Sequence, residues 1–198
     1  MIRHIVFDVG HVFVRIEPRP MLELLAEHAA RCVDLPSVLA AIELDEHECG
    51  RLSGDALIER IGGLTARAVS PALLTSKWLD MFEPQPEMFA LARTLAARYR
   101  VYLLSNIGEL HWEHLCREYA LNRLAHDALP SFVAGVMKPD AAIYAQAEAR
   151  FALEPQATVF IDDRAENIAA ARARGWHGIL HGGHAETVAA LRELGVEA

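Results

Sequence analysis

The sequence predicts an α/β protein with a mainly parallel sheet and one helical insertion. Short apolar runs rich in β-branched residues alternate with Ala-, Leu-, Arg- and Glu-rich stretches of helical period along most of the chain. Three of the apolar runs end in polar side chains, as buried strands do at a functional edge. A third observation is that residues 17–84 carry helical patterns and no convincing strand.

The expected elements follow in chain order. The first strand is the run from Ile2 to Phe7, which ends at Asp8, and later strands are expected at 100–104, 157–161 and 177–180. Helices are expected at about 86–98, 109–120, 140–151, 164–174 and 185–195.

The insertion is expected to form a helical cap. Its helical patterns are broken by Pro36, Gly50, Gly54, Gly62-Gly63 and Pro71. Residues 1–16 and 85–198 would then form the core, and residues 17–84 the cap. Because the cap begins just after the first strand, it would cover the carboxyl edge of the sheet, where open α/β sheets bind ligands.

Composition narrows the class of protein. The chain has 198 residues, 53% of them hydrophobic, and 19 basic against 27 acidic residues give a net charge of −8. This composition excludes disordered and collagen-like proteins. A net acidic chain lacks the attraction to phosphate backbones that nucleic-acid binding needs, so we expect no nucleic-acid partner. The short, interrupted apolar runs predict neither a membrane anchor nor an export signal.

The cysteines favour a cytoplasmic location. Cys32, Cys49 and Cys116 are an odd, widely spaced set without a C-x-x-C pair. Such a set fits reduced thiols better than a disulfide framework. The pattern leaves the oligomeric state open.

Polar side chains follow three of the expected strands. Asp8 follows the first, Ser105 and Asn106 the second, and Asp162 and Asp163 the third. Each alone is typical of a turn or helix cap. Parallel strands bring these ends together, and the resulting carboxylates would repel one another unless protons or a hard cation neutralised them. Mg²⁺ is the expected ion.

Lys138 is a further candidate because the chain has only one other lysine, Lys77. It stands before Pro139 at an expected loop-to-helix junction, where it could neutralise a phosphate or a carboxylate nucleophile. A surface role is the alternative. Ser105 and Asn106 could donate hydrogen bonds to an anion, or could cap the next helix.

Four segments stand out, in chain order: Phe7-Asp8-Val9-Gly10-His11-Val12, Leu104-Ser105-Asn106, Met137-Lys138-Pro139-Asp140 and Phe160-Ile161-Asp162-Asp163-Arg164-Ala165-Glu166-Asn167. Together they resemble the four motifs of the haloacid dehalogenase-like hydrolase superfamily, and Gly50-Arg51-Leu52-Ser53 resembles a recurrent cap stretch. Glycine at position 10, two residues after Asp8, resembles the glycine at the same place in the bacterial α-D-glucose-1-phosphate phosphatase type. The resemblance implies a Rossmann-like, three-layer core, a small cap, and a Mg²⁺-dependent phosphatase acting on a small phosphate ester.

The resemblance also implies residue roles. Asp8 would be the nucleophile that forms an aspartyl-phosphate, and also a metal ligand. Asp163 would bind Mg²⁺ directly, Asp162 would support the metal or its waters, and the Gly10 carbonyl would complete the protein ligands.

The remaining implied roles concern the phosphate. Ser105 would hold a phosphate oxygen, Asn106 would orient the site, and Lys138 would bridge nucleophile and phosphate.

Gly10 departs from the family pattern, in which most phosphatases carry a general acid two residues after the nucleophile. Acid–base help is typically worth about 10²- to 10⁴-fold in rate. One possibility is that His11, a group on the substrate or solvent replaces the general acid. The other is that the leaving group needs less protonation, as in a sugar 1-phosphate. The alternative for His11 is a wall or buried histidine bound to backbone.

Two other functions are considered. In a 2-haloacid dehalogenase the aspartate attacks carbon and needs no metal, so the Asp162-Asp163 pair favours phosphate. The other is a non-catalytic protein that binds a phosphorylated metabolite and has lost its general acid.

Three residues in or near the cap could select the substrate: Arg15, Arg19 and Trp78. The alternative for the two arginines is a solvated surface charge, and for the tryptophan it is packing in the core.

Overall fold

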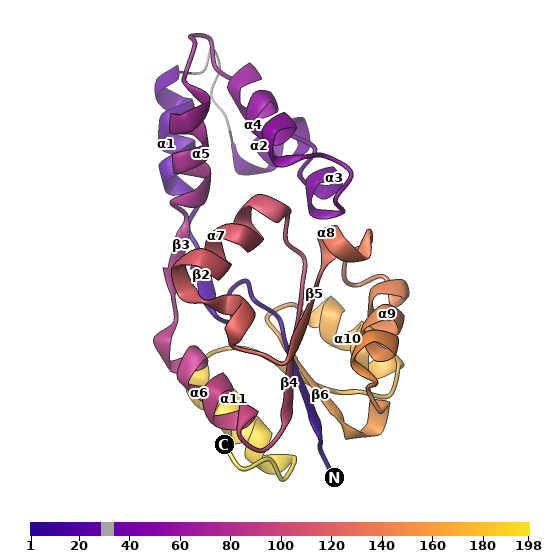
Figure 1. The fold of residues 1–198 in the computed structure, drawn as a ribbon. Coiled ribbons are helices and arrows are strands. Elements are labelled where there is room, and N and C mark those ends of the chain that lie inside the picture. Colours follow the sequence, from indigo (N-terminus) through magenta and orange to yellow (C-terminus); the bar gives the residue numbers. More distant parts are fainter. Residues whose placement is uncertain (29–33) are drawn as a thin grey trace.

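The computed structural model describes residues 1–28 and 34–198, and its centre is a five-stranded parallel sheet (Figure 1). The strands lie in the order β5-β4-β1-β6-β7. Their bounds are β1 His4–Phe7, β4 Arg100–Ser105, β5 Asp127–Pro130, β6 Thr158–Asp162 and β7 His177–Leu180. The chain adds β4 and β5 on one side of β1 and then β6 and β7 on the other. Sheets of this kind bind ligands at such a change of winding direction, beyond the carboxyl ends of the strands.

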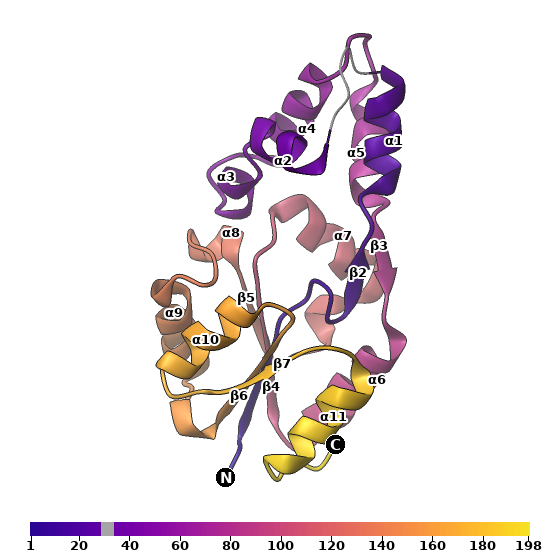
Figure 2. The same cartoon turned by 180° about the vertical axis from the view of Figure 1, so that it is seen from behind.

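Helices cover both faces of the sheet (Figures 1 and 2). Helices α6 (Pro86–Ala96), α7 (Glu109–Tyr119) and α11 (His184–Glu193) lie on one face, and α9 (Ala141–Phe151) and α10 (Ala165–Ala173) on the other. Successive strand side chains point to opposite faces, so Ile5 and Phe7 pack in one apolar cluster and Val6 in the other. The result is the three-layer α/β core that the sequence predicts.

Short elements complete this core. Helix α8 spans Ser131–Ala134, and two 3₁₀ turns, η1 and η2, span Leu121–Arg123 and Pro155–Ala157. The four strands and five helices expected for the core are all present, with ends shifted by at most two residues.

Among the described residues of the segment after β1, five helices lie beyond the carboxyl edge of the sheet (Figure 1). They are α1 Arg19–His28, α2 Leu35–Ala41, α3 Leu44–Glu48, α4 Gly54–Gly63 and α5 Pro71–Leu79. Side-chain oxygens of Asp34, Ser53 and Ser70 accept hydrogen bonds from the first-turn amides of α2, α4 and α5. These helices pack around an apolar cluster of their own, which includes Leu25, Ile42, Leu57, Ile61 and Leu74.

Two expectations need correction. The segment 17–84 contains strand β3 (Phe82–Pro84), which pairs antiparallel with β2 (Val14–Ile16) and connects the helices to the core. Strand β5 was also not expected. Strands β3 and β5 are only three and four residues long and both end in proline, so neither shows the alternation of apolar and polar residues that marks a strand. Strand β5 tolerates Pro130 because it lies at the edge of the sheet. The boundaries 1–16, 17–84 and 85–198 stay a prediction.

Helix α3 is docked on the core beside α8. The hydroxyl of Ser131 donates a hydrogen bond of 2.6 Å to the carbonyl of Glu48 and accepts one of 2.9 Å from the amide of Ile107. Gly50 follows at φ +71°, and a Cβ there would overlap the carbonyl of Phe132. Glycine is therefore required for the close approach of α3 to the core.

No helix within residues 1–28 and 34–198 is both long and apolar enough to cross a bilayer. In the same ranges Cys49 and Cys116 are free thiols, whereas Cys32 lies outside the described residues.

Candidate active site

The carboxyl edge of the sheet gathers three aspartates. Asp8 follows β1 and Asp162 ends β6, and the amide of Asp8 donates a 2.8 Å hydrogen bond to Ile161 of β6. Asp163 is next in the chain. One carboxylate oxygen from each of the three residues lies within 4.8 Å of the others. The convergence follows from the parallel pairing of β1 and β6 in register.

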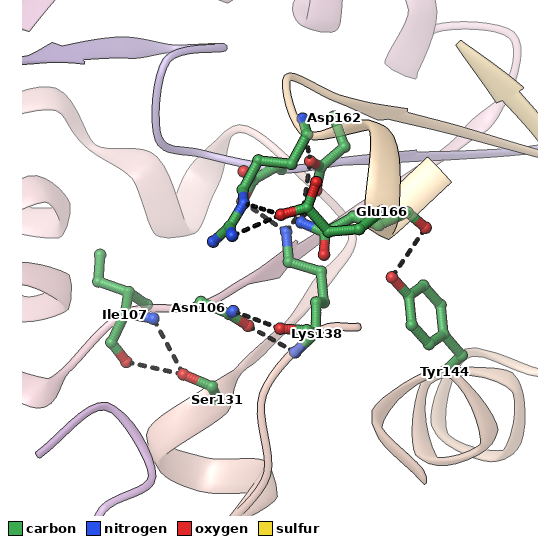
Figure 3. Close-up of polar contacts among 10 residues, drawn as sticks. Asn106, Ile107, Ser131, Lys138, Tyr144, Asp162 and Glu166 are labelled. Atoms are coloured by element: carbon green, nitrogen blue, oxygen red, sulfur yellow. Dashed lines mark hydrogen bonds and ion pairs between the residues drawn. The ribbon is translucent and has the colours of Figure 1, made fainter. Parts of the chain in front are cut away.

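The side chain of Lys138 extends toward Asp162 (Figure 3). Its Nζ is 2.8 Å from Oδ1 of Asp8 and 2.7 Å from Oδ2 of Asp162, and the residue is only 3% exposed. The ammonium also lies 5.3 Å from the centre of the Phe160 ring. The surface alternative for Lys138 is therefore wrong.

Asn106 holds the main chain of Lys138 in place (Figure 3). Its Nδ2 donates to the Lys138 carbonyl and its Oδ1 accepts from the Lys138 amide, both at 2.8 Å. This pair joins the loop after β4 to the loop that carries the lysine. Ser105 is buried at the end of β4, beside Asn106. Direct substrate contacts by Ser105 and Asn106 stay predictions.

The two adjacent aspartates have different surroundings. Asp162 is fully buried, and its carboxylate accepts hydrogen bonds from Lys138, from the Arg164 amide and from Nδ2 of Asn167. Asp163 is half-buried. The hydrogen bonds fix Asp162 in place, which leaves Asp163 better suited to bind an ion directly.

The electrostatics of the site call for a cation. Burial raises the pKa of Asp8, and the Lys138 ammonium opposes that rise. Burial alone would lower the pKa of Lys138, but Asp8 and Asp162 together raise it. Burial and the charge of Asp162 raise the pKa of Asp163. Three carboxylates face one ammonium, and the excess negative charge must be neutralised before an anionic ester can approach.

The donor set fits Mg²⁺. Magnesium prefers oxygen ligands, is commonly bound by one or two carboxylates together with substrate phosphate, and compensates negative charge at such sites. Asp8 and Asp163 offer carboxylate oxygens in this arrangement, and the Gly10 carbonyl lies in the same loop after β1.

A family model described as haloacid dehalogenase-like hydrolase matches residues 2–175. The chain belongs to this family. This hydrolase is also similar to curated phosphatases. It is 24% identical over 191 residues to a sesquiterpene phosphatase from Aspergillus oryzae, covering 96% of this chain and 94% of the relative. It is 29% identical over 181 residues to a D-ribitol-5-phosphate phosphatase from Bacteroides thetaiotaomicron, covering 85% and 86%.

Solved structures share the fold of this hydrolase. A HAD-like family hydrolase from Porphyromonas gingivalis aligns with a TM-score of 0.84, 24% identity and full coverage of both chains. A HAD family enzyme from Bacteroides thetaiotaomicron, solved in complex with magnesium and inorganic phosphate, aligns with a TM-score of 0.81 and 21% identity over 90% of this chain and 93% of that one.

Gly10 and His11 occupy the loop that follows Asp8 in this hydrolase. A Cβ at residue 10 would lie 3.2 Å from Cδ1 of Ile16, so an apolar side chain fills the space beside Gly10. His11 is exposed at φ +53°, and its carbonyl accepts a 2.8 Å hydrogen bond from Gln85. The charge of His11 acts to lower the pKa of Asp163. The buried alternative for His11 is therefore wrong.

Glu48, at the end of α3, is a carboxyl that the sequence did not single out. Burial raises its pKa to about 7, and the charges of Asp45 and Asp8 raise it further whereas Lys138 and Arg164 lower it. Glu48 and His11 line the same cavity, so the insertion places a carboxyl near the loop after β1. The only sequence signal for Glu48 is its place two residues before Gly50, where the recurrent cap stretch begins. Ser131 and Asn167 were likewise assigned no role from the sequence.

Proposed function

We propose that this hydrolase is a Mg²⁺-dependent phosphatase that hydrolyses small phosphorylated metabolites through an aspartyl-phosphate. The observation that carries the proposal is the buried Asp8 carboxylate, which Lys138 contacts at 2.8 Å beside two further carboxylates. This arrangement suits a nucleophile that must accept an anionic phosphoryl group. Asp8, Asp163 and the Gly10 carbonyl would hold the metal, with Asp162 in support.

The chain's own residues account for two bond-making steps. A carboxylate oxygen of Asp8 forms a bond to phosphorus as the ester P–O bond breaks, and the departing oxygen takes a proton from an acid. Water then attacks phosphorus and releases inorganic phosphate, which restores the Asp8 carboxylate. Lys138 neutralises charge on nucleophile and phosphate, and Asn106 keeps the lysine in place. Mg²⁺, when bound, offsets the negative charge that gathers on the phosphoryl oxygens.

The proton for the leaving oxygen would come from His11, from a group of the substrate or from solvent. Ser105 would bind a phosphate oxygen. A sugar 1-phosphate would reduce the need for an acid because its leaving oxygen is a better leaving group than an alkoxide. Of the two phosphatase relatives, one is named for D-ribitol 5-phosphate and one for a sesquiterpene substrate, which supports a small phosphate ester without choosing its leaving group.

The proposal extends to the partner, the cellular location and the class of substrate. The net charge of −8 supports a small-molecule partner and no nucleic acid. The free thiols Cys49 and Cys116 support a cytoplasmic location. The cluster of three carboxylates favours phosphate over a haloacid, because attack on carbon in a dehalogenase requires no metal.

Phosphate release from p-nitrophenyl phosphate tests the proposal. Wild type with Mg²⁺ should turn over, EDTA should stop turnover, and Asp8→Asn should abolish it. Asp55→Asn, on the exposed side of α4, is the matched control and should retain activity. Turnover insensitive to EDTA would contradict a metal phosphatase. Absence of turnover of any phosphate ester by metal-loaded wild type would favour the non-catalytic alternative.

A further inference from the structure

A cavity of about 280 Å³ lies between the inserted helices and the core loop after β1. Most of its wall is hydrocarbon from α1, α2, α5 and the β3 region. The principal apolar residues are Met21, Leu22, Val38, Leu39, Trp78 and Phe82. Small-molecule sites usually measure about 300–1,000 Å³, so this cavity has room for one small organic group.

Three polar residues reach the wall: His11, Glu48 and His111. His111 is buried, stacks on Trp78 with ring centres 4.8 Å apart, and shares a 3.1 Å hydrogen bond between its Nε2 and the Trp78 carbonyl. Burial lowers the pKa of His111 to about 3. The imidazole is therefore neutral, and this part of the wall acts as an aromatic surface.

The other two polar residues lie where the inserted helices meet the loop after β1. His11 is three residues after Asp8 in that loop, and Glu48 ends α3, where its carbonyl accepts a 2.6 Å hydrogen bond from Ser131 of the core. Ile16 also lines the cavity, and its Cδ1 fills the space beside Gly10. The apolar cavity therefore reaches the loop that directly follows Asp8.

The wall discriminates between leaving groups. A polyol in this cavity would bury hydroxyls against hydrocarbon, and each hydroxyl left without a partner weakens binding by about tenfold or more. A hydrocarbon group makes no such demand, and each methylene removed from water strengthens binding by up to about fourfold.

We infer that the substrate is a phosphate monoester of an apolar alcohol, whose hydrocarbon group enters this cavity while its phosphate lies against Asp8 and Lys138. This inference rests on the proposed phosphatase function. Hydrolysis breaks the P–O bond to the alcohol, water supplies the oxygen that becomes part of inorganic phosphate, and the apolar alcohol leaves with a proton.

A chain-length series tests the inference. Values of kcat/KM with Mg²⁺ are measured for linear alkyl monophosphates from ethyl to decyl, below the concentrations at which they form micelles, and for glucose 1-phosphate and ribitol 5-phosphate. We expect kcat/KM to rise by about two- to fourfold per methylene until the cavity is full, and to exceed the values for both sugar phosphates. A flat series, or preference for a sugar phosphate, overturns the inference and leaves the phosphatase proposal intact. Failure to hydrolyse any ester removes the phosphatase proposal itself.

A matched pair of variants locates the effect. Leu39 is half-buried in the cavity wall, whereas Leu73 is 40% exposed on α5 and lies outside it. Leu39→Gln should lower kcat/KM for octyl phosphate by about tenfold or more and leave ethyl phosphate nearly unchanged. Leu73→Gln should change neither. Equal losses on both esters in Leu39→Gln would contradict a hydrocarbon site at this wall.

Calorimetry of the wild-type protein tests the same inference without a variant, so its result does not depend on whether a variant folds. Alkyl phosphonates, which cannot be hydrolysed, are titrated into the Mg²⁺-loaded protein at several temperatures. If the hydrocarbon group is buried, the heat-capacity change of binding becomes more negative as the chain lengthens. A heat-capacity change independent of chain length would show that the alkyl group stays in water and would overturn the inference.

Discussion

Nζ of Lys138 lies 2.8 Å from Oδ1 of Asp8, and both residues are buried. The same ammonium contacts Asp162 at 2.7 Å, so one cation serves two carboxylates that are far apart in the sequence. A buried charge without a partner is costly, and the two contacts therefore hold the loop after β1, the loop after α8 and the end of β6 in one arrangement.

Replacing Lys138 by methionine should disrupt both catalysis and stability. Without the ammonium, Asp8 and Asp162 lose their counter-charge, so we expect the free energy of unfolding to fall by about 3–5 kcal/mol near pH 8. The deficit should shrink as pH falls, because protonated carboxyls need no cation. Urea unfolding at several pH values measures it, and phosphate release should fall by about 10²-fold or more. Lys77→Met, at the only other lysine, is the control; equal destabilisation in both variants would refute the assignment.

Magnesium should stabilise the folded protein through Asp163. At a Mg²⁺ concentration 100 times its Kd, the expected gain is about 2.7 kcal/mol, seen as a higher Tm. Asp163→Asn should shift the Mg²⁺ dependence of Tm to higher concentration, and Asp55→Asn should follow wild type. An unchanged Mg²⁺ response in Asp163→Asn would remove this residue from the metal site.

His11→Asn separates the candidates for the missing acid. If His11 protonates the leaving oxygen, turnover of alkyl phosphates should fall by about 10²- to 10⁴-fold. p-Nitrophenyl phosphate should lose much less, because its leaving group departs as a stable anion. His177→Asn, at the start of β7 and hence at the opposite edge of the sheet, is the control. Near-normal rates on alkyl esters would exclude His11 from the mechanism.

Glu48→Gln should change how stability depends on pH. The pKa of Glu48 is about 7 in the folded protein, above its ordinary value of 4.5, so the native state retains a proton that the unfolded chain releases. Wild type therefore loses stability as pH rises from about 4.5 through 7, by about 1–3 kcal/mol, and the glutamine variant does not. Denaturant midpoints of the metal-free protein at pH 5 and pH 8 measure the difference. Exposed Glu59→Gln should parallel wild type, and identical pH profiles for wild type and Glu48→Gln would contradict the prediction.

Much of the fold could be predicted because its elements are encoded locally. The run Ile5-Val6-Phe7 has the β-branched and aromatic character of a buried strand, and the alternation of such runs with helical stretches specifies a parallel sheet. Strands β2, β3 and β5 could not be predicted. They contain three or four residues each, and their pairing depends on neighbours distant in the sequence.

Residue order is enough to predict which side chains stand at strand ends, because Asp8 and Asp162 directly follow apolar runs. Three features depend on how the chain packs: Asn106 hydrogen-bonds to the backbone of Lys138 on both sides, Glu48 lines a cavity together with His11, and hydrocarbon forms most of that cavity's wall. These residues are far apart along the chain. Strand formation depends on neighbouring residues, whereas charge pairing and cavity shape depend on how separate segments pack, which no local pattern records.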